Sequence, residues 1–224
     1  MKTVIKYLKP FIVFIVICLC CQVVRAYGEL KLPNIMSDLV NVGIQYGGFE
    51  EKAPSDITYE GIDTLGKFMT DEDAETFKNS YEDAYSGHWI LSEDAASKEL
   101  DEIYITSCMA ALAYYRDISD EDDSFSLNWF YGHTPEIDAM VADGSIGRYI
   151  DEAQKTYTLT GNGAEICVTF SKGFAEDLGL DLHKIQMDYM IKRSLLMIVY
   201  LFVVLLFNVT VGYCAVKKIG RAHV

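Results

Sequence analysis

Carboxylates are the most abundant groups in this 224-residue sequence that could do chemistry, with 33 Asp and Glu against 19 Lys and Arg. Paired carboxylates could serve a hydrolase, whereas a calcium loop needs alternating Asp or Asn, a Gly and a distal Glu. The densest acidic stretch, Asp117 to Asp123, lacks that order. We therefore interpret the acidity as solvated charge, with Asp120 to Asp123 as a loop.

Other reactive residue types are sparse. His88 and His133 are lone histidines beside aromatic residues, which favours a structural role over metal binding or catalysis. Gly161-Asn162-Gly163 lacks the pattern of a phosphate loop and predicts a turn. Four aromatic residues lie close together in the sequence and are expected in the core: Phe125, Trp129, Phe130 and Tyr131. No residue is assigned a catalytic, cofactor-binding or metal-binding role, and no nucleophile–base arrangement supports a membrane-anchored hydrolase.

Charge is strongly segregated along the chain. All acidic residues lie between Glu29 and Asp188, together with ten of the Lys and Arg residues, and both ends are purely basic. Such an acidic middle repels phosphate, which excludes nucleic acid as a partner. The sequence is nevertheless 50% hydrophobic, so this middle is able to bury a core.

The stretch Ser194 to Val216 contains no Asp, Glu, Lys, Arg or His. A helix of about 20 residues crosses the hydrocarbon core of a bilayer. This stretch therefore predicts a membrane span, flanked by Lys192 and Arg193 on one side and by Lys217 and Lys218 on the other. Asn208-Val209-Thr210 has the pattern of a glycosylation acceptor but lies inside this span. We expect Asn208 and Thr210 to hydrogen-bond to a neighbouring helix instead.

The beginning of the chain has two interpretations. Residues 1–10 are basic and Phe11 to Val24 is apolar apart from one Gln, as in a signal peptide with a cleavage site at Val24-Arg25-Ala26. The alternative is a helix that stays in the protein. Apolar residues recur at three- and four-residue spacing as far as Ile44, and Arg25 and Glu29 could pair four residues apart.

The acidic middle is predicted to be mainly helical. Thr70 is expected to cap a helix to about Tyr85, and Ser92 to open one that runs to Arg116. Three more helices are expected at 134–144, 146–157 and 164–178, the first with Pro at its first position. Cys108 and Cys167 are the two cysteines of this region, and they form either one disulfide or two buried thiols.

Two stretches resemble the permease part of bacterial ABC exporters, in which permease and ATPase are fused. The first is Tyr7-Leu8-Lys9-Pro10 followed by residues 29–44, ELKLPNIMSDLVNVGI, with Leu39 where that family commonly has Ile. The second is residues 179–186, GLDLHKIQ, followed by Tyr189 and the apolar run. These stretches are similar to the first transmembrane helix and to the entry of the second.

The resemblance implies an all-α fold in which two long transmembrane helices carry a mainly helical extracellular domain. Residues 1–10 would be cytoplasmic, 11–44 the first helix, 45–180 an acidic extracellular domain and 181–218 the second helix, starting at an Asp181 cap. An inserted extracellular domain at this point resembles a subset of these exporters, largely from Gram-positive bacteria. The full-length protein would bind ATP and magnesium. Its partners would be the lipid bilayer, its own remaining permease helices and nucleotide-binding domain, and a second half-transporter.

Residues 219–224, IGRAHV, match one reading frame of a common short-read sequencing adapter. We therefore expect this chain to be the amino-terminal fragment of a longer exporter. The alternative is a complete cell-surface binding or sensor protein with a cleaved signal peptide and a carboxy-terminal membrane anchor.

Overall fold

The computed structural model describes residues 12–50, 52–84, 87–119 and 125–222. It is 76% helix and 5% strand, which confirms a mainly helical fold. The chain divides into two compact units, Phe49–Ile185 and a second unit that joins Met1–Gly48 with Gln186–Val224. Residues 1–10 and the acidic loop at 120–123, which figured in the sequence predictions, lie outside the described residues.

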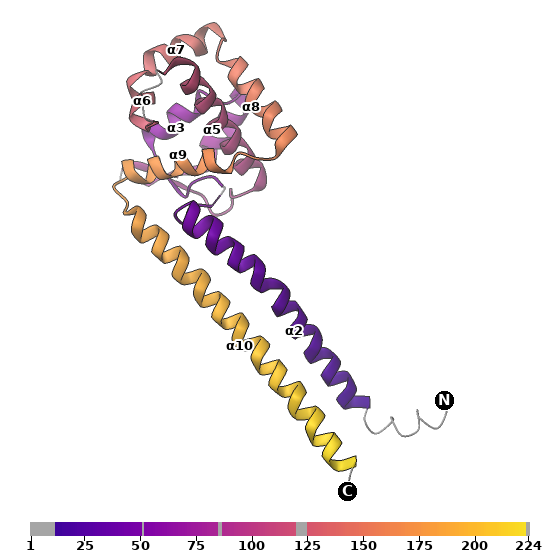
Figure 1. Cartoon of the computed structure of the whole chain (residues 1–224). Helices are drawn as coiled ribbons and strands as arrows, with labels where there is room; N and C mark the ends of the chain where they lie inside the picture. The colour runs from indigo at the N-terminus through magenta and orange to yellow at the C-terminus, as the bar shows by residue number, and fades with distance from the viewer. Residues whose placement is uncertain (1–11, 51, 85–86, 120–124, 223–224) are drawn as a thin grey trace. The chain divides into compact units, whose positions relative to one another are not determined.

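The unit Phe49–Ile185 is built around helix α5, Lys98–Ile118, which contacts α3, α4, α8 and α9. Its buried face carries ten residues, among them Tyr104 and Tyr114, which are almost completely enclosed. Figure 1 shows α5 surrounded by the other helices of this unit. These are α3 (Tyr59–Gly66), α4 (Asp71–Asn79), α6 (Leu127–Gly132), α7 (Thr134–Asp143), α8 (Gly147–Thr160) and α9 (Ala164–Asp177).

Local capping chemistry sets several of these helix ends. The Thr70 side chain accepts a hydrogen bond from the Asp73 N–H at 3.2 Å, as predicted, and three acidic residues occupy the first turn of α4. Gly144 ends α7 and Gly161 ends α8, with φ of 75° and 60°, where a side chain would be strained. The predicted turn at 161–163 is thereby confirmed.

Two predicted helix boundaries are wrong. The helix that Thr70 caps ends at Asn79 rather than near Tyr85, and α5 begins after Ser97 rather than Ser92. Residues 81–83 form a short strand instead of helix, whereas residues 92–97 follow a strand that ends at Leu91 and include a turn at 93–95. The Ser97 hydroxyl accepts a hydrogen bond from Leu100 N at 3.2 Å, which makes Ser97 the actual cap.

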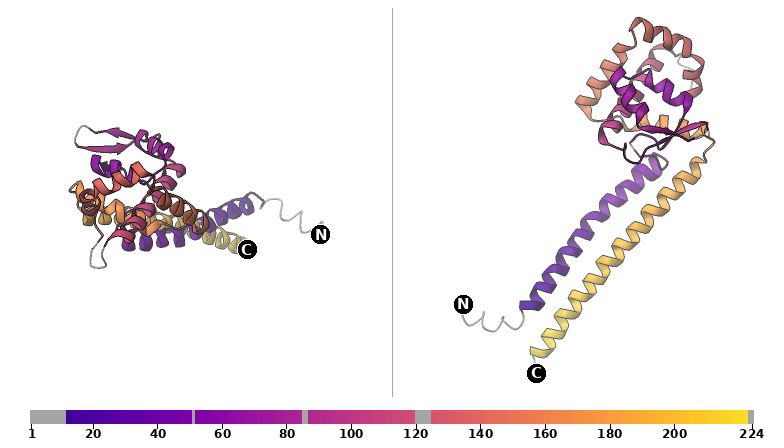
Figure 2. Two further views of the ribbon diagram at one scale, coloured as in Figure 1. Left: turned by 90° about the horizontal axis from the view of Figure 1, so that it is seen from above. Right: turned by 180° about the vertical axis from the view of Figure 1, so that it is seen from behind.

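The strands on either side of residues 84–87 belong to a three-stranded antiparallel sheet that was not predicted from the sequence. Its strands are β1 (Asp56–Thr58), β2 (Tyr81–Asp83) and β3 (His88–Leu91), in the order β1-β3-β2, with Ile57 opposite Trp89 and Glu82 opposite Ile90. Figure 2 shows this sheet at the edge of the unit. Strands of three or four residues are too short to display a two-residue alternation in the sequence.

The second unit consists of two long helical segments. Helix α2, Ile12–Asp38, continues into the π-helical segment η2, Leu39–Gln45, and α10 spans Leu182–Ala222. Pro33 lies inside α2 and has no N–H to donate to the carbonyl of Glu29. The Asp181 carboxylate accepts hydrogen bonds from the N–H groups of His183 and Lys184 at 3.0 and 3.2 Å, which confirms the predicted cap.

Among the described residues, one helix is long and apolar enough to cross a membrane. It covers Leu182–Tyr213, its best window has a mean hydropathy of 2.6, and none of that window is buried within the protein. Helix α2 did not qualify by this criterion. The coarse prediction of an apolar helix able to span a bilayer therefore holds for α10.

Two leucines, one buried in the core around α5 and one exposed, provide a test of this packing. Leu100 is 2% exposed and Leu159 is 76% exposed. We expect Leu100→Ala to lower the free energy of unfolding of this unit by about 2–5 kcal/mol, because truncation leaves a cavity. Leu159→Ala should change it by less than about 0.5 kcal/mol.

Urea unfolding followed by tryptophan fluorescence measures this difference in the full chain. Both tryptophans, Trp89 and Trp129, belong to the unit Phe49–Ile185, so the signal reports on that unit. Equal losses for the two variants would contradict the assignment of Leu100 to the core.

Candidate functional site

Helices α2 and α10 run antiparallel, as Figures 1 and 2 both show, and each contributes one less exposed stripe. Spacings of three and four residues alternate along both stripes, which is a 3.5-residue repeat and is typical of left-handed helix pairs. We call this contact the seam. Its positions are Cys18, Cys21, Arg25, Gly28, Leu32, Ile35, Leu39 and Val42 on one side, and Gln186, Met190, Arg193, Met197, Tyr200, Val204, Phe207 and Val211 on the other.

Two glycines, Gly28 within the seam and Gly43 next to its last position on that side, mark local close approaches to the other helix. A Cβ atom on Gly28 would lie 2.7 Å from Cγ2 of Val204, which is closer than carbon atoms pack. A Cβ atom on Gly43 would lie 3.2 Å from Cγ of Met190, and the carbonyl of Gly43 accepts a hydrogen bond from Gln186 Nε2 at 2.9 Å. Small residues at such positions are typical of helix pairs in membranes. The sequence analysis did not single out these glycines.

Polar contacts fix the register at two places along the seam. The Arg25 guanidinium contacts Glu29 Oε1 at 2.8 Å, as the sequence predicts, and donates from Nη1 to Asn208 Oδ1 at 3.2 Å. Further along, Arg193 Nη1 lies 3.8 Å from Asp38 Oδ2. Asn208 therefore bonds to the neighbouring helix as expected. The same expectation for Thr210 is wrong, because its hydroxyl donates to the Leu206 carbonyl of its own helix at 2.8 Å.

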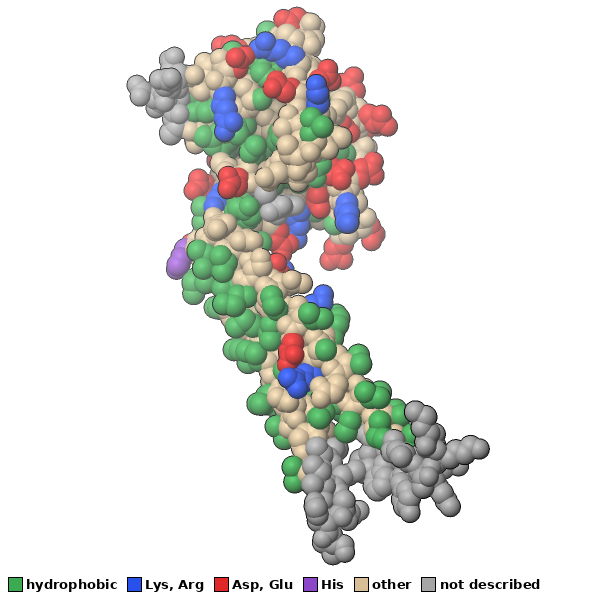
Figure 3. Space-filling model, turned by 45° about the vertical axis from the view of Figure 1, so that its right-hand side comes forward, with side chains coloured by type: hydrophobic (Ala, Val, Ile, Leu, Met, Phe, Trp, Pro, Cys, Tyr) green, Lys and Arg blue, Asp and Glu red, His purple; other side chains and the backbone are tan. Residues whose placement is uncertain are grey.

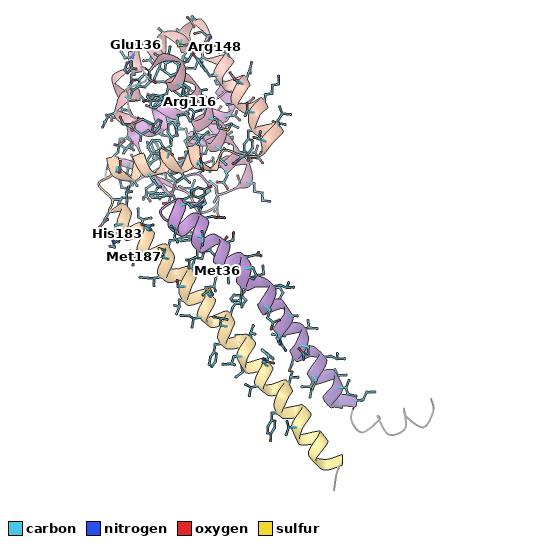
Figure 4. All side chains as sticks on the ribbon, viewed as in Figure 1. Met36, Arg116, Glu136, Arg148, His183 and Met187 are labelled. Atoms are coloured by element: carbon cyan, nitrogen blue, oxygen red, sulfur yellow. The ribbon has the colours of Figure 1, made fainter. Side chains whose placement is uncertain are left out.

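The faces of both helices away from the seam are apolar and exposed. On α2, Val23 is 69% and Leu30 73% exposed, and on α10, Phe202 is 64% exposed. Figure 3 shows hydrophobic side chains over most of this surface, interrupted by charged side chains part-way along it. Met187 projects from α10 on the side away from α2 (Figure 4). Such faces require either lipid or further helices as neighbours.

The unit Phe49–Ile185 has a shallow acidic groove at its sheet. Two carboxylates there are already engaged: the Tyr59 hydroxyl bonds to Asp83, and the Ser92 hydroxyl donates to Glu82 Oε1 at 2.8 Å. The groove is lined by Glu82, Asp83, Ala84, Ile90, Leu91, Ser92, Glu93 and Asp94. Among the described residues, no group of three or more His, Cys, Asp or Glu is arranged to hold a metal ion.

The two histidines flagged in the sequence have protein partners. His133 stacks on Trp129 with ring centroids 4.0 Å apart, and its Nδ1 lies 2.8 Å from the Trp129 carbonyl oxygen. His88 Nε2 lies 3.7 Å from Asp56 Oδ1, on the neighbouring strand. These contacts support the structural role that the sequence predicted for both residues.

The aromatic residues predicted to be core do form one. Phe130 is fully buried and contacts Phe68, Tyr115 and Phe170 at centroid distances of 5.8 to 6.1 Å. Phe125, Trp129 and Tyr131 are half-buried around it. Tyr131 also donates to Asp177 Oδ2 at 2.7 Å. This cluster is therefore packing rather than a platform for a ligand.

Cys108 and Cys167 are completely buried, and the structure contains them as thiols rather than as a disulfide. Burial is the main reason why the pKa of the Cys108 thiol is raised well above its ordinary value. Nearby, the Tyr104 hydroxyl contacts the Cys167 carbonyl oxygen at 3.0 Å and the Ser171 hydroxyl at 2.7 Å. These hydrogen bonds satisfy polar groups in the core that joins α5 to α9.

The buried thiols generate a prediction about their reactivity. In a variant in which Cys18, Cys20, Cys21 and Cys214 are replaced by Ala, iodoacetamide at pH 8 should leave the folded chain unlabelled. A protonated and inaccessible thiol is a poor nucleophile. In denaturant without reductant, mass spectrometry should find two labels per chain. Labelling that requires a reductant would instead demonstrate a disulfide.

The seam generates a second prediction. In a background without native cysteines, Gly28→Cys with Val204→Cys should form an intramolecular disulfide on mild oxidation, because Val204→Cys also removes the methyl group that crowds position 28. Cleavage at a protease site inserted in the 161–163 turn should then leave the two fragments linked. The control pair Leu30→Cys with Val204→Cys should separate into two fragments, since Leu30 faces away from the seam. Linkage of both pairs, or of neither, would contradict this register.

Comparisons with known proteins yield no relative: no family model, no curated protein and no solved structure matches this chain.

Proposed function

We propose that this chain is the amino-terminal part of the membrane region of an ATP-driven exporter. In this proposal, α2 with η2 and α10 are two membrane-spanning helices, and residues 49–185 form a domain outside the cell. The observation that carries the proposal is the antiparallel seam. It joins the two stretches that resemble permease helices in one register, although more than 140 positions of sequence separate Gly43 from Gln186.

The exposed apolar faces support a membrane setting for both helices. In water, side chains such as Leu30 and Phe202 would cost free energy at about 25 cal/mol per Å² of exposed apolar surface. In a bilayer, the same side chains contact lipid or further helices. The backbone hydrogen bonds of long helices are satisfied internally, as a membrane span requires.

The basic residues favour one orientation. Lys2, Lys6 and Lys9 precede α2, and Lys217 and Lys218 follow the apolar run of α10. The positive-inside rule places such clusters in the cytoplasm. The acidic unit Phe49–Ile185 then lies on the outer side, where its charge is solvated.

The chain would have a mechanical rather than a chemical role in transport. In the proposed exporter, ATP and magnesium bind in a nucleotide-binding domain elsewhere in the protein, and α2 and α10 take part in alternating access. The local contacts at Gly28 and Gly43 and the polar contacts between the two helices would couple their movements in this proposal. No catalytic, ATP-binding or metal-binding role is proposed for residues of this chain.

The alternative is a cell-surface binding protein with a cleaved signal peptide. Two observations favour the exporter. Helix α2 passes through the possible cleavage site at residues 24–26 without a break, and Arg25 within that site contacts Asn208 across the seam.

Orientation is tested by labelling single cysteines in intact cells. Thr158 is exposed on α8, and Thr3 precedes α2. With the native cysteines replaced, we expect a membrane-impermeant maleimide to label Thr158→Cys from outside and to label Thr3→Cys only after permeabilisation. Amino-terminal sequencing of the same protein should begin at Met1. A mature chain that begins at Tyr27 would establish the signal-peptide alternative.

The exporter assignment itself is tested at the level of the gene. Long-read sequencing downstream of the Lys218 codon should reveal an open frame with further apolar spans, followed by a G-x-x-x-x-G-K-S/T phosphate loop. A stop codon directly after Val224 in genomic sequence would refute the exporter assignment, and would leave the anchored surface protein.

A further inference from the structure

The seam places a charged pair deep within the apolar part of α10. Arg25 contacts Asn208, Gly28 approaches Val204 and Asp38 lies near Arg193. These antiparallel contacts align the part of α2 between Arg25 and Asp38 with residues 193–208. Asn208 itself lies within the uncharged run Ser194–Val216, eight positions before its end. The Arg25–Glu29 pair is therefore level with the interior of the membrane under the proposed function.

Arg25 has more hydrogen-bond donors than the described residues satisfy. Its guanidinium carries five N–H groups, of which Nε bonds to Glu29 and one on Nη1 bonds to Asn208. In the described part of the chain, the other three have no acceptor. The side chains of Arg25 and Glu29 are 33% and 48% exposed, so neither is enclosed by the helix pair. Charged groups inside a membrane face protein or water rather than lipid.

A further polar side chain marks the same face of α2. Gln22 is exposed and lies three residues before Arg25, so the two are neighbours on the helix surface. Glu29 lies one turn beyond Arg25 on this face. The adjacent residue Val23 projects from a different face, where it is 69% exposed among apolar side chains.

We propose that the face of α2 with Gln22, Arg25 and Glu29 lines a water-filled path through the membrane, and that Arg25 contacts an anionic or polar group of the transported solute there. An anionic oxygen would accept the N–H groups that the helix pair leaves unused, as guanidinium groups commonly bind carboxylate and phosphate. This inference rests on the proposed function, because it requires α2 to remain in the membrane.

Modification of single cysteines by charged methanethiosulfonates tests the proposal in native membranes. These reagents react with the thiolate, which forms only where water is present. In the full chain without native cysteines, we expect Gln22→Cys to react at least about tenfold faster than Val23→Cys, its neighbour on the apolar face. The positive charge of Arg25 should also favour the anionic over the cationic reagent at position 22, and Arg25→Gln should lower that ratio.

The other possible outcomes refute different parts of the proposal. Slow reaction at both positions means that α2 is dry at this depth, which refutes the path and leaves the two-span arrangement standing. Fast reaction at both positions places this part of α2 in water, which refutes the proposed function as well. A charge preference that Arg25→Gln leaves unchanged refutes the role of Arg25. A chain that begins at Tyr27 lacks position 22, and it refutes the proposed function directly.

Discussion

The close approach of α2 and α10 at Gly28 is the constraint on which the arrangement of these two helices depends. A Cβ atom at this position would overlap with Val204, so the register of the two helices requires glycine there. Once this register is set, Arg25 reaches Asn208, Arg193 comes within ion-pair distance of Asp38, and Gln186 reaches the carbonyl of Gly43. In a bilayer, where lipid is as apolar as the side chains, such packing and polar contacts are what holds helices together.

The unit Phe49–Ile185 is stabilised in a different way. Its stability depends on apolar burial around α5, where Tyr104, Cys108 and Ala110 have no exposed surface. Its charges remain outside, mostly solvated and partly paired, as in the contacts of Lys67 with Asp63 and Asp138 at 3.3 and 2.8 Å. The Lys67 side chain is only 16% exposed, but its two carboxylate partners are solvated, and ion pairs with solvated partners contribute little to stability. The acidic surface therefore keeps the unit soluble without determining its fold.

Among the described residues, neither unit brings together a group that the sequence would assign a catalytic role. Neither the sheet-side groove nor the aromatic core offers a nucleophile with a base, and the buried thiol of Cys108 is held neutral by its surroundings. The features that remain unexplained by packing are the polar and charged residues on α2. They are costly in an apolar environment, and the proposed path along this face of α2 would give them a polar one.

The sequence by itself determined the elements with strong local signals. An uncharged run at 194–216 indicates a span-length apolar helix, because a polar backbone must be satisfied internally in lipid. The caps at Thr70 and Asp181, the turn at 161–163 and the pairing of Arg25 with Glu29 were also predicted, since each depends on residues a few positions apart.

Tertiary structure alone decided the rest. The sheet combines a local hairpin of β2 and β3 with the pairing of β1 on β3, in which Ile57 lies opposite Trp89 more than 30 positions away. The choice between thiols and a disulfide, and the seam that joins Gly28 to Val204, likewise depend on which distant residues meet, and no local pattern encodes that.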